Sequence, residues 1–192
     1  LDLETFNESN LSINFQKTSN DTYLKVHDIN SKIMTSNTVM NSSVDVNFSK
    51  NDTSMDVNMD VYENLSKSDE RYEFVVPNYD YRNKLSFSEE LGTFNFQSRG
   101  YYKNFETNKK QTKLINDFFW SSNDYIGNSG IITKVEGNLK NSNYRAEKTA
   151  DHKNDQNNIE LTGAVSLLSS LPLEKQSENY KKTFTPKLML RS

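Results

Sequence analysis

The sequence of 192 residues has no cysteine, three prolines, six glycines and two histidines. Without cysteine, disulfides, thiolate catalysis and cysteine-based metal sites are excluded within these residues. No apolar run approaches the roughly 18 to 20 residues that a spanning helix needs, which excludes such a helix within this sequence. The net charge of −3 is small and spread out. There is no basic stripe of the kind that binds nucleic acid, so no nucleic-acid partner is expected.

Hydrophobic residues are also scarce, at 33% of the sequence, while asparagine, serine, lysine and aspartate dominate. Such polarity is typical of disordered chains. However, aromatic residues make up 11% of the sequence, and apolar and polar residues alternate repeatedly along it. We therefore expect a folded chain built almost entirely from β-strands.

The clearest alternation lies in residues 53–63. Its apolar and polar members follow one another without a slip: Met55, Val57, Met59 and Val61 against Ser54, Asp56, Asn58 and Asp60. Because successive side chains of a strand point to opposite faces, this pattern predicts a strand with one apolar and one acidic face. Residues 42–50 show the same pattern, and Lys50-Asn51-Asp52 predicts a tight turn between the two.

Similar alternation predicts further strands, at residues 10–18, 22–29, 92–104, 112–122, 130–140, 158–168 and 183–191. We expect Leu11, Ile13 and Phe15 on one face of the first, and Phe184, Leu188 and Leu190 on one face of the last. A second tight turn is predicted at residues 128–130, and long polar connections at 141–157 and 172–182. No segment has a 3.6-residue apolar stripe, and we identify no internal domain boundary.

Three features bear on the environment of this sheet. Many predicted strands have 9 to 13 residues, longer than typical soluble strands and close to the 9 to 11 that cross a bilayer at a tilt. Full charges occur in mid-strand on the polar faces, and short and long connections alternate, as in outer-membrane barrels. Soluble antiparallel sandwiches alternate as well. The pattern alone leaves both a transmembrane barrel and a secreted sandwich or solenoid open.

Few residues suggest a metal or catalytic site. Asp56, Asn58 and Asp60 imitate the start of a calcium loop, but Val61 occupies the glycine position and Lys67 the final glutamate position, which disfavours calcium. The only histidines are His27, in a predicted strand, and His152, in a predicted loop. Neither has neighbours with metal-ligand or triad spacing, so both are interpreted as ordinary surface or lumen residues. We predict no catalytic residue, cofactor or metal.

Two other groups of residues allow two interpretations each. The charges of Asp69, Glu70, Arg71 and Glu73 form either a network in a polar lumen or, as we favour, a solvated hairpin end. The aromatic side chains of the second half suit either an interfacial girdle of a barrel or a soluble core: Phe94, Phe96, Tyr102, Phe118 and Trp120.

Three stretches carry a resemblance to a known family: "SNLSINFQKTSNDTYLKVHDINS" (9–31), "YENLSKSDERYEFVVPNYDY" (62–81) and "SLPLEKQSENYKKTFTPKLMLRS" (170–192). The most specific parts are Arg71-Tyr72-Glu73-Phe74 with Pro77, and Thr185-Pro186-Lys187 after the turn at 172–175. Together they resemble the lipopolysaccharide-assembly outer-membrane protein family LptD, formerly called organic solvent tolerance protein. The resemblance runs over nearly the whole sequence.

This resemblance implies a fold and a function beyond what alternation can indicate. Members of the family have a periplasmic jellyroll followed by a very large outer-membrane barrel. They are not enzymes. They receive lipopolysaccharide from a periplasmic bridge protein and release it sideways into the outer leaflet, with the plug lipoprotein LptE inside the lumen. Some members carry cysteines whose disulfides control assembly; this sequence has none, so either that control is absent here or the cysteines lie outside this sequence.

We therefore expect an all-β fold of antiparallel up-and-down strands, with residues 1–192 forming the N-terminal portion of a large transmembrane β-barrel in the outer membrane of a Gram-negative bacterium. The expected partners are lipopolysaccharide, LptE, the bridge protein and outer-membrane lipid. The substrate-binding residues stay unassigned. The alternative is a secreted or surface β-sandwich binding module, similar to an adhesin repeat.

Overall fold

The computed structural model describes all residues except 1–5, 28–35, 86–88, 107–108, 150–155 and 178–179. Within the described residues the strands are β1 (Glu8–Asn14), β2 (Val39–Lys50), β3 (Thr53–Asn64), β4 (Tyr72–Leu85), β5 (Thr93–Phe105), β6 (Lys109–Ser121), β7 (Tyr125–Ile126), β8 (Ile132–Glu147), β9 (Asn157–Ser170), β10 (Leu173–Ser177), β11 (Tyr180–Phe184) and β12 (Lys187–Arg191). Two short helical segments complete the described elements, α1 (Tyr23–His27) and the 3₁₀ turn η1 (Glu89–Leu91).

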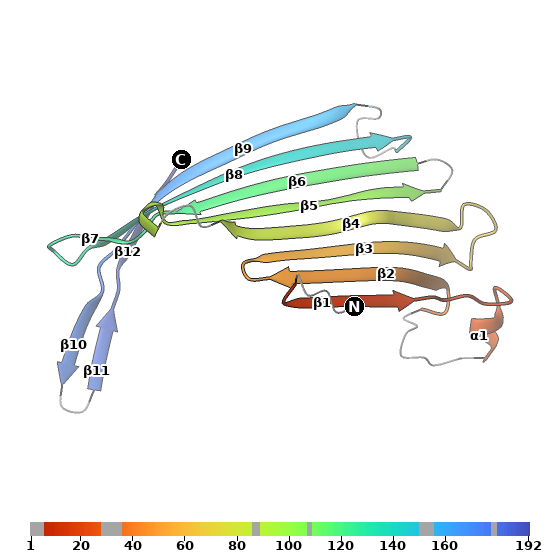
Figure 1. Cartoon of the computed structure of the whole chain (residues 1–192), viewed down its shortest axis with the longest axis horizontal. Coiled ribbons are helices and arrows are strands. Elements are labelled where there is room, and N and C mark those ends of the chain that lie inside the picture. The colour runs from red at the N-terminus through yellow and green to blue at the C-terminus, as the bar shows by residue number, and fades with distance from the viewer. Residues whose placement is uncertain (1–5, 28–35, 86–88, 107–108, 150–155, 178–179) are drawn as a thin grey trace. The chain divides into compact units, whose positions relative to one another are not determined.

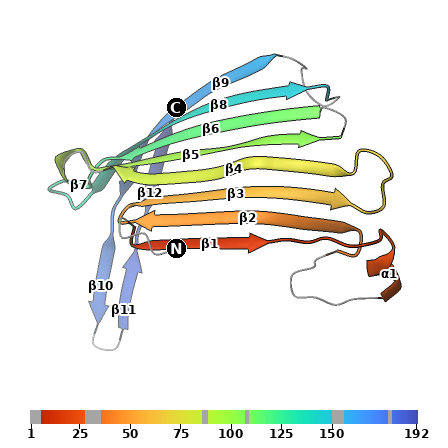
Figure 2. The same cartoon turned by 45° about the vertical axis from the view of Figure 1, so that its right-hand side comes forward.

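Most strands belong to one sheet, whose order is β1-β2-β3-β4-β5-β6-β8-β9-β12, with β7 paired to β8. Figures 1 and 2 show β1 to β6, β8 and β9 side by side in chain order. This confirms the prediction of an all-β, antiparallel, up-and-down fold. Among the described strands the sheet is not closed, because the order begins at β1 and ends at β12. A separate two-stranded sheet pairs β10 with β11.

The chain divides into two compact units. The first unit comprises Leu1–Asn83, Gln97–Asn116 and Ser142–Glu160, and the second comprises Lys84–Phe96, Asp117–Asn141 and Leu161–Ser192. Each unit therefore takes its strand segments from distant parts of the sequence.

The hairpin of β2 and β3 agrees closely with the sequence pattern. Its strands pair without interruption from Val39 opposite Asn64 to Lys50 opposite Thr53. Asn51 takes the tight turn with a φ of 50°, a left-handed conformation that asparagine tolerates better than most residues. The predicted turn at residues 128–130 is also present, closed by a 2.9 Å bond from the Gly130 amide to the Gly127 carbonyl.

The predicted return strand at residues 22–29 is wrong over its described part, because Tyr23–His27 form the helix α1. The Asn20 side chain accepts a hydrogen bond from the Thr22 amide, and the Val26 amide donates to the Thr22 carbonyl. Asparagine next to a helix start satisfies amides that have no partner in the helix. These local bonds therefore outweigh an alternation of only two apolar residues, Leu24 and Val26.

Strand boundaries differ from the prediction in the first half. The first strand ends at Asn14, so Phe15 lies beyond it. Strand β4 was not predicted, because Pro77 has no amide to donate and such a residue weakens the strand pattern. The structure accommodates Pro77 beside a bulge, where the register to β3 shifts between Asn58 and Asp60.

Two predicted loops and one predicted strand also need correction. Residues 141–147 continue β8 instead of starting a long connection. Residues 173–177 and 180–184 form the hairpin of β10 and β11, where a loop was expected, with Lys181 and Glu174 in an ion pair of 2.8 Å. The strand predicted at 183–191 is interrupted around Pro186, so Phe184 belongs to a different sheet from Leu188 and Leu190.

The expected alternation of short and long connections is not observed. In an antiparallel sheet successive connections lie at opposite ends of the strands. One end has the connections 15–38, 65–71, 106–108 and 148–156, and the other has 51–52, 86–92, 122–131 and 171–186. Both ends thus combine short and long connections, so connection length does not indicate which end would face the periplasm.

Candidate functional site

The first unit has an apolar face on β1 to β4. Three rows of opposed residues run across it: Leu11, Val46, Val57 and Tyr79; Ile13, Val44 and Met59; Phe48, Met55 and Tyr81. These side chains are not covered by another layer, since Ile13 is 67% exposed and Met59 is 42% exposed. The face predicted from the alternation of residues 53–63 therefore exists, and in the structure it is open.

The opposite face of the same strands is polar and internally hydrogen-bonded. The Asn47 amide donates to Asp56 at 2.7 Å, and the Asn58 amide donates to Asp45 at 2.6 Å. Asn41 donates to Asp60 at 3.4 Å. Each carboxylate of this cross-strand ladder thus has an amide partner, which offsets part of the cost of placing charges in mid-strand.

The ladder continues from β4 to β5 in the first unit. Asp80 lies opposite Asp56, and both Arg82 and Gln97 donate to its carboxylate, Arg82 at 2.6 Å and Gln97 at 2.9 Å. Lys103 forms an ion pair with Glu73 at 2.7 Å. The polar face therefore changes from carboxylate–amide pairs on β2 and β3 to ion pairs on β4 and β5.

The second unit also has an apolar face. Its aromatic rings pair across β5 and β6, with Phe96 and Phe118 centroids 4.6 Å apart and Phe94 and Trp120 centroids 6.2 Å apart. On β9 and β12 the aliphatic side chains are exposed to between 39% and 67%: Leu161, Val165, Leu167, Leu188 and Leu190. Register places Leu190 opposite Leu167.

A hollow of about 790 Å³ lies in this second apolar face. Its aromatic lining residues are Phe94, Phe118, Phe119 and Trp120, and it passes over Gly137 and Gly163, which leave no side chain in its path. The polar side of this unit holds ion pairs instead, Lys140 with Asp117 and Lys134 with Glu136, each at 3.4 Å. Both units therefore share the same division into an open apolar and a charged face.

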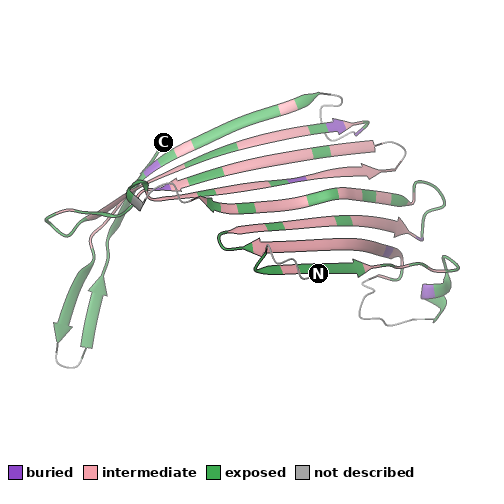
Figure 3. Cartoon of the chain, in the orientation of Figure 1, coloured by how far each residue is buried: buried purple, intermediate pink, exposed green. Residues whose placement is uncertain are grey.

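Little hydrophobic core exists among the described residues. The buried apolar side chains are Leu24, Met40, Leu65 and Ala146, of which the first three form one cluster. Figure 3 shows the strands mostly in the intermediate and exposed classes. A soluble domain of this size would bury most of its large apolar side chains. The apolar faces thus need an apolar environment that lies outside the described residues.

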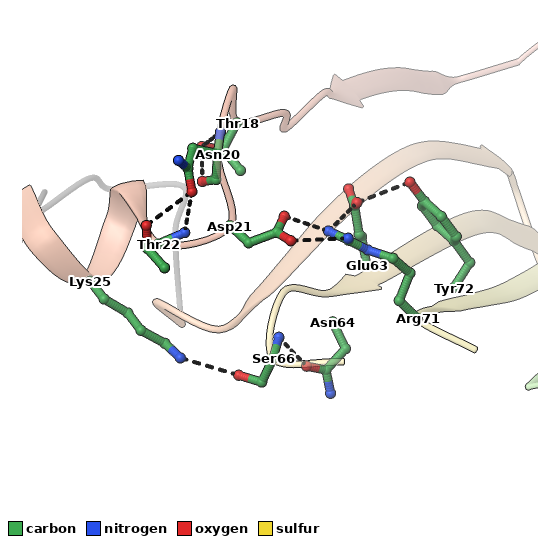
Figure 4. Close-up of polar contacts among 10 residues, drawn as sticks. All are labelled: Thr18, Asn20, Asp21, Thr22, Lys25, Glu63, Asn64, Ser66, Arg71 and Tyr72. Carbon is green, nitrogen blue, oxygen red and sulfur yellow. Dashed lines mark hydrogen bonds and ion pairs between the residues drawn. The ribbon is translucent and has the colours of Figure 1, made fainter. Parts of the chain in front are cut away.

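The core cluster of Leu24, Met40 and Leu65 lies at one end of β2, β3 and β4. Figure 4 shows its polar side, in which Arg71 donates to both carboxylate oxygens of Asp21, at 2.7 and 3.2 Å, and contacts Glu63 at 2.8 Å. The Arg71 hydrogen bond holds the pKa of Asp21 below its ordinary value. We call residues 16–27, which the Asp21–Arg71 contact joins to the end of the β3–β4 connection, the cap segment.

The predicted site residues fall in different places. Asp56, Asn58 and Asp60 lie on strand β3 and bond to β2 side chains, so they do not form a loop. His27 lies in helix α1 with its ring 4.5 Å from that of Tyr23, which corrects its placement in a strand. His152 lies outside the described residues. Among the described residues there is no cluster of His, Cys, Asp or Glu that could hold a metal ion.

The charged and aromatic groups are resolved in part. Arg71 and Glu73 take part in the ion pairs described above, whereas Asp69 is exposed next to Ser68. Arg71 and Glu73 thus belong to ion pairs, and Asp69 has the solvated position expected of a hairpin end. Phe94, Phe96, Tyr102, Phe118 and Trp120 are half-buried or exposed, so none belongs to a buried core. No pattern in the sequence indicates the Asp21–Arg71 contact, because the whole β2–β3 hairpin lies between the two residues.

No helix in the described part of the chain is both long and apolar enough to span a membrane. In comparisons with known proteins, no family model matches the sequence and no curated protein is significantly similar to it.

Proposed function

We propose that the chain forms part of a transmembrane β-barrel in the outer membrane of a Gram-negative bacterium. The observation that carries this proposal is the open apolar face opposite a hydrogen-bonded polar face, on strands as long as β3 and β8. Lipid would cover the apolar face, and a wet lumen would solvate the polar one. In lipid every backbone group needs a partner, so the edges at β1 and β12 would pair with further strands.

Strand length supports the same proposal. β3 has 12 residues and β8 has 16. At a rise of ~3.3 Å per residue and a tilt of ~45°, 12 residues cover ~28 Å along the membrane normal, close to the hydrocarbon thickness of ~30 Å. Soluble sheets have strands of about 5 to 6 residues, so their hydrophobic faces are much narrower.

We further propose that the barrel delivers lipopolysaccharide from the periplasm to the outer leaflet, through its lumen and a lateral seam. The resemblance of residues 9–31, 62–81 and 170–192 to the LptD family supports this role, and the polar face of β2 to β5 suits a saccharide chain in transit. The mechanism is positional, not catalytic. Proposed partners are LptE, the periplasmic bridge protein and outer-membrane lipid.

The barrel proposal is tested by folding the chain in buffer, in detergent micelles and in lipid vesicles. We expect stable β-sheet circular dichroism and resistance to protease only with detergent or lipid. A chain that is monomeric and folded in buffer alone would instead identify a soluble sheet, as in the binding-module alternative.

The transport proposal needs the intact protein in its own host. Depletion of that protein should leave newly made lipopolysaccharide inaccessible to a lipopolysaccharide-modifying enzyme added outside the cells. Depletion of an unrelated outer-membrane protein is the control. Unchanged surface delivery after depletion would reject the transport role and leave the barrel proposal standing.

A further inference from the structure

A small pocket lies beside the cap segment, at the ends of β2 to β5. Its volume is about 250 Å³, which is below the range of pockets for drug-sized ligands and suits a ligand of about one ring. Its lining includes residues of four strands, β2 to β5, and of the β3–β4 connection. Charged and aromatic side chains of its lining are Tyr62, Lys67, Glu70, Arg71, Glu73 and Phe105.

The pocket opens on the polar side of the first unit. Tyr62 lies opposite Glu73 in the β3–β4 register, and Tyr62 follows Asp56, Asn58 and Asp60 at every second position of β3. The residues of the cross-strand ladder and the pocket residue Tyr62 therefore lie on the same face of β3. Under the barrel proposal, this side faces the lumen.

The charges of the pocket are mixed in sign and are neutralised locally. Glu73 pairs with Lys103 at 2.7 Å, Lys67 approaches Glu106 at 3.8 Å, and Arg71 is engaged by Asp21 and Glu63. An added anion would meet carboxylates, and an added cation would meet Lys67 and Arg71. The lining therefore does not favour a ligand with a full charge of either sign.

What the lining does offer is hydrogen-bond donors and acceptors in close alternation, next to aromatic rings. A carboxylate accepts bonds only, and an ammonium or guanidinium donates them only, so a group that does both is satisfied between them. Hydroxyl groups have this property. The rings of Tyr62 and Phe105 add flat apolar surfaces, which a ring with C–H groups on its face would cover.

We propose that this pocket binds a single saccharide ring, with its hydroxyls between the charged side chains and its C–H face against the aromatic rings. The inference rests on the proposed function, because it assigns the sugar portion of lipopolysaccharide a holding point on the lumen side. It adds a binding site and a ligand class that alternation in the sequence does not indicate.

The test uses the 192-residue chain folded in micelles of lauryldimethylamine oxide, a detergent without a sugar headgroup, with its β-sheet content checked by circular dichroism. Methyl β-glucoside, methyl β-galactoside and methyl α-mannoside are the probes, followed by saturation-transfer NMR. Inorganic phosphate is a separate probe. We expect transfer to the ring C–H protons of at least one glycoside with a Kd on the order of a millimolar, as for a ligand with few atoms, and no binding of phosphate.

Two variants of Phe105 locate the binding. Phe105→Leu removes the aromatic surface and should raise the Kd about three- to tenfold, whereas Phe105→Tyr keeps the ring and should bind as the parent does. Phe118→Leu, which changes a ring of the second unit, is the matched control and should have no effect. Circular dichroism of each variant separates lost binding from lost folding.

The inference is overturned if folded chain gives no transfer to any glycoside, if phosphate binds more tightly than they do, or if Phe118→Leu weakens binding as much as Phe105→Leu. Its failure is distinguishable from failure of the barrel proposal. A chain that needs lipid to fold but ignores the glycosides keeps the barrel and loses the pocket. A chain that binds glycosides while folded in plain buffer keeps the pocket and loses the barrel.

Discussion

The division of β3 into a lipid face and a lumen face can be tested with one pair of substitutions. Val57 lies in the apolar row between Val46 and Tyr79, and its neighbour Asn58 lies in the polar ladder. Val57→Arg places a charge on the proposed lipid face. Asn58→Arg places the same charge beside Asp45, now 2.6 Å from the Asn58 amide, on the proposed lumen face.

The magnitude follows from the position of Val57 along the strand. β3 spans Thr53–Asn64, so Val57 is about one and a half residues from the strand centre. This displacement amounts to roughly 3 to 4 Å along the membrane normal at a rise of ~3.3 Å and a tilt of ~45°. An arginine near the midplane on the lipid face costs about 2 to 4 kcal/mol, or roughly 30- to 900-fold in the folding equilibrium.

The expected cost of Asn58→Arg is about 1 kcal/mol or less. The substitution removes one hydrogen bond, worth about 0.5 to 1.5 kcal/mol, and gains an ion pair with Asp45 in a polar environment. A third variant adds a depth series, because Met55 lies nearer to the end of the strand. Met55→Arg should cost less than Val57→Arg, since the penalty falls toward the membrane surface.

The assay is reversible unfolding by guanidinium in phosphatidylcholine vesicles, followed by fluorescence of Trp120, the only tryptophan. The free energy of unfolding of each variant is compared with that of the parent chain. Equal losses for Val57→Arg and Asn58→Arg would refute the assignment of faces. A larger loss for Asn58→Arg would mean that the ladder faces a dry environment, as in a soluble sandwich with a polar core.

Three other outcomes are expected. Leu24→Ala removes the α1 side chain of the cluster of Leu24, Met40 and Leu65 and should cost about 2 kcal/mol, at the low end of leucine-to-alanine changes, measured as faster proteolysis within residues 15–38. Arg71 lowers the folded-state pKa of Asp21, so their contact stabilises the cap segment at pH values above the ordinary pKa of an aspartate, and this stabilisation is lost as the pH falls through the lower folded-state pKa. Hydrogen exchange of the Val26 amide should therefore accelerate in acid for the parent chain, and Asp21→Asn should abolish that pH dependence. Trp120 lies at the end of β6, and its indole donates to the Leu91 carbonyl at 2.7 Å. Lipids brominated near the headgroup should therefore quench its fluorescence more than lipids brominated near the chain end, and the reverse order would contradict the proposed depth.

Local pattern predicted the fold well where one face of a strand had a single chemical character. In residues 42–60 every apolar residue is followed by a polar one, and a shift of one residue would exchange the two faces completely. Strands β2 and β3 and their turn therefore appear in the structure as the sequence indicates. The same reasoning located β5, β6, β8 and β9, although their ends extend beyond the predicted bounds.

The errors have three physical causes. In residues 22–27 short-range hydrogen bonds accepted by the Asn20 side chain and the Thr22 carbonyl compete with a weak alternation, and residues 23–27 form a helix. Near Pro77 a β-bulge accommodates the proline, a residue that strand propensity excludes from the interior of a sheet. Residues 173–177 and 180–184 form a polar hairpin by backbone pairing without an apolar face, which periodicity of hydrophobic residues cannot detect.

The sequence by itself determined the strand character of this protein and the composition of its two faces, because a period of two fixes which side chains share a side. Only the tertiary structure decided which strands pair, that Arg71 fastens Asp21 across a distance of 50 residues in the sequence, and that Tyr62 and Phe105 line one pocket. These contacts depend on strand order and register. Strand order is not encoded in the alternation of any single strand.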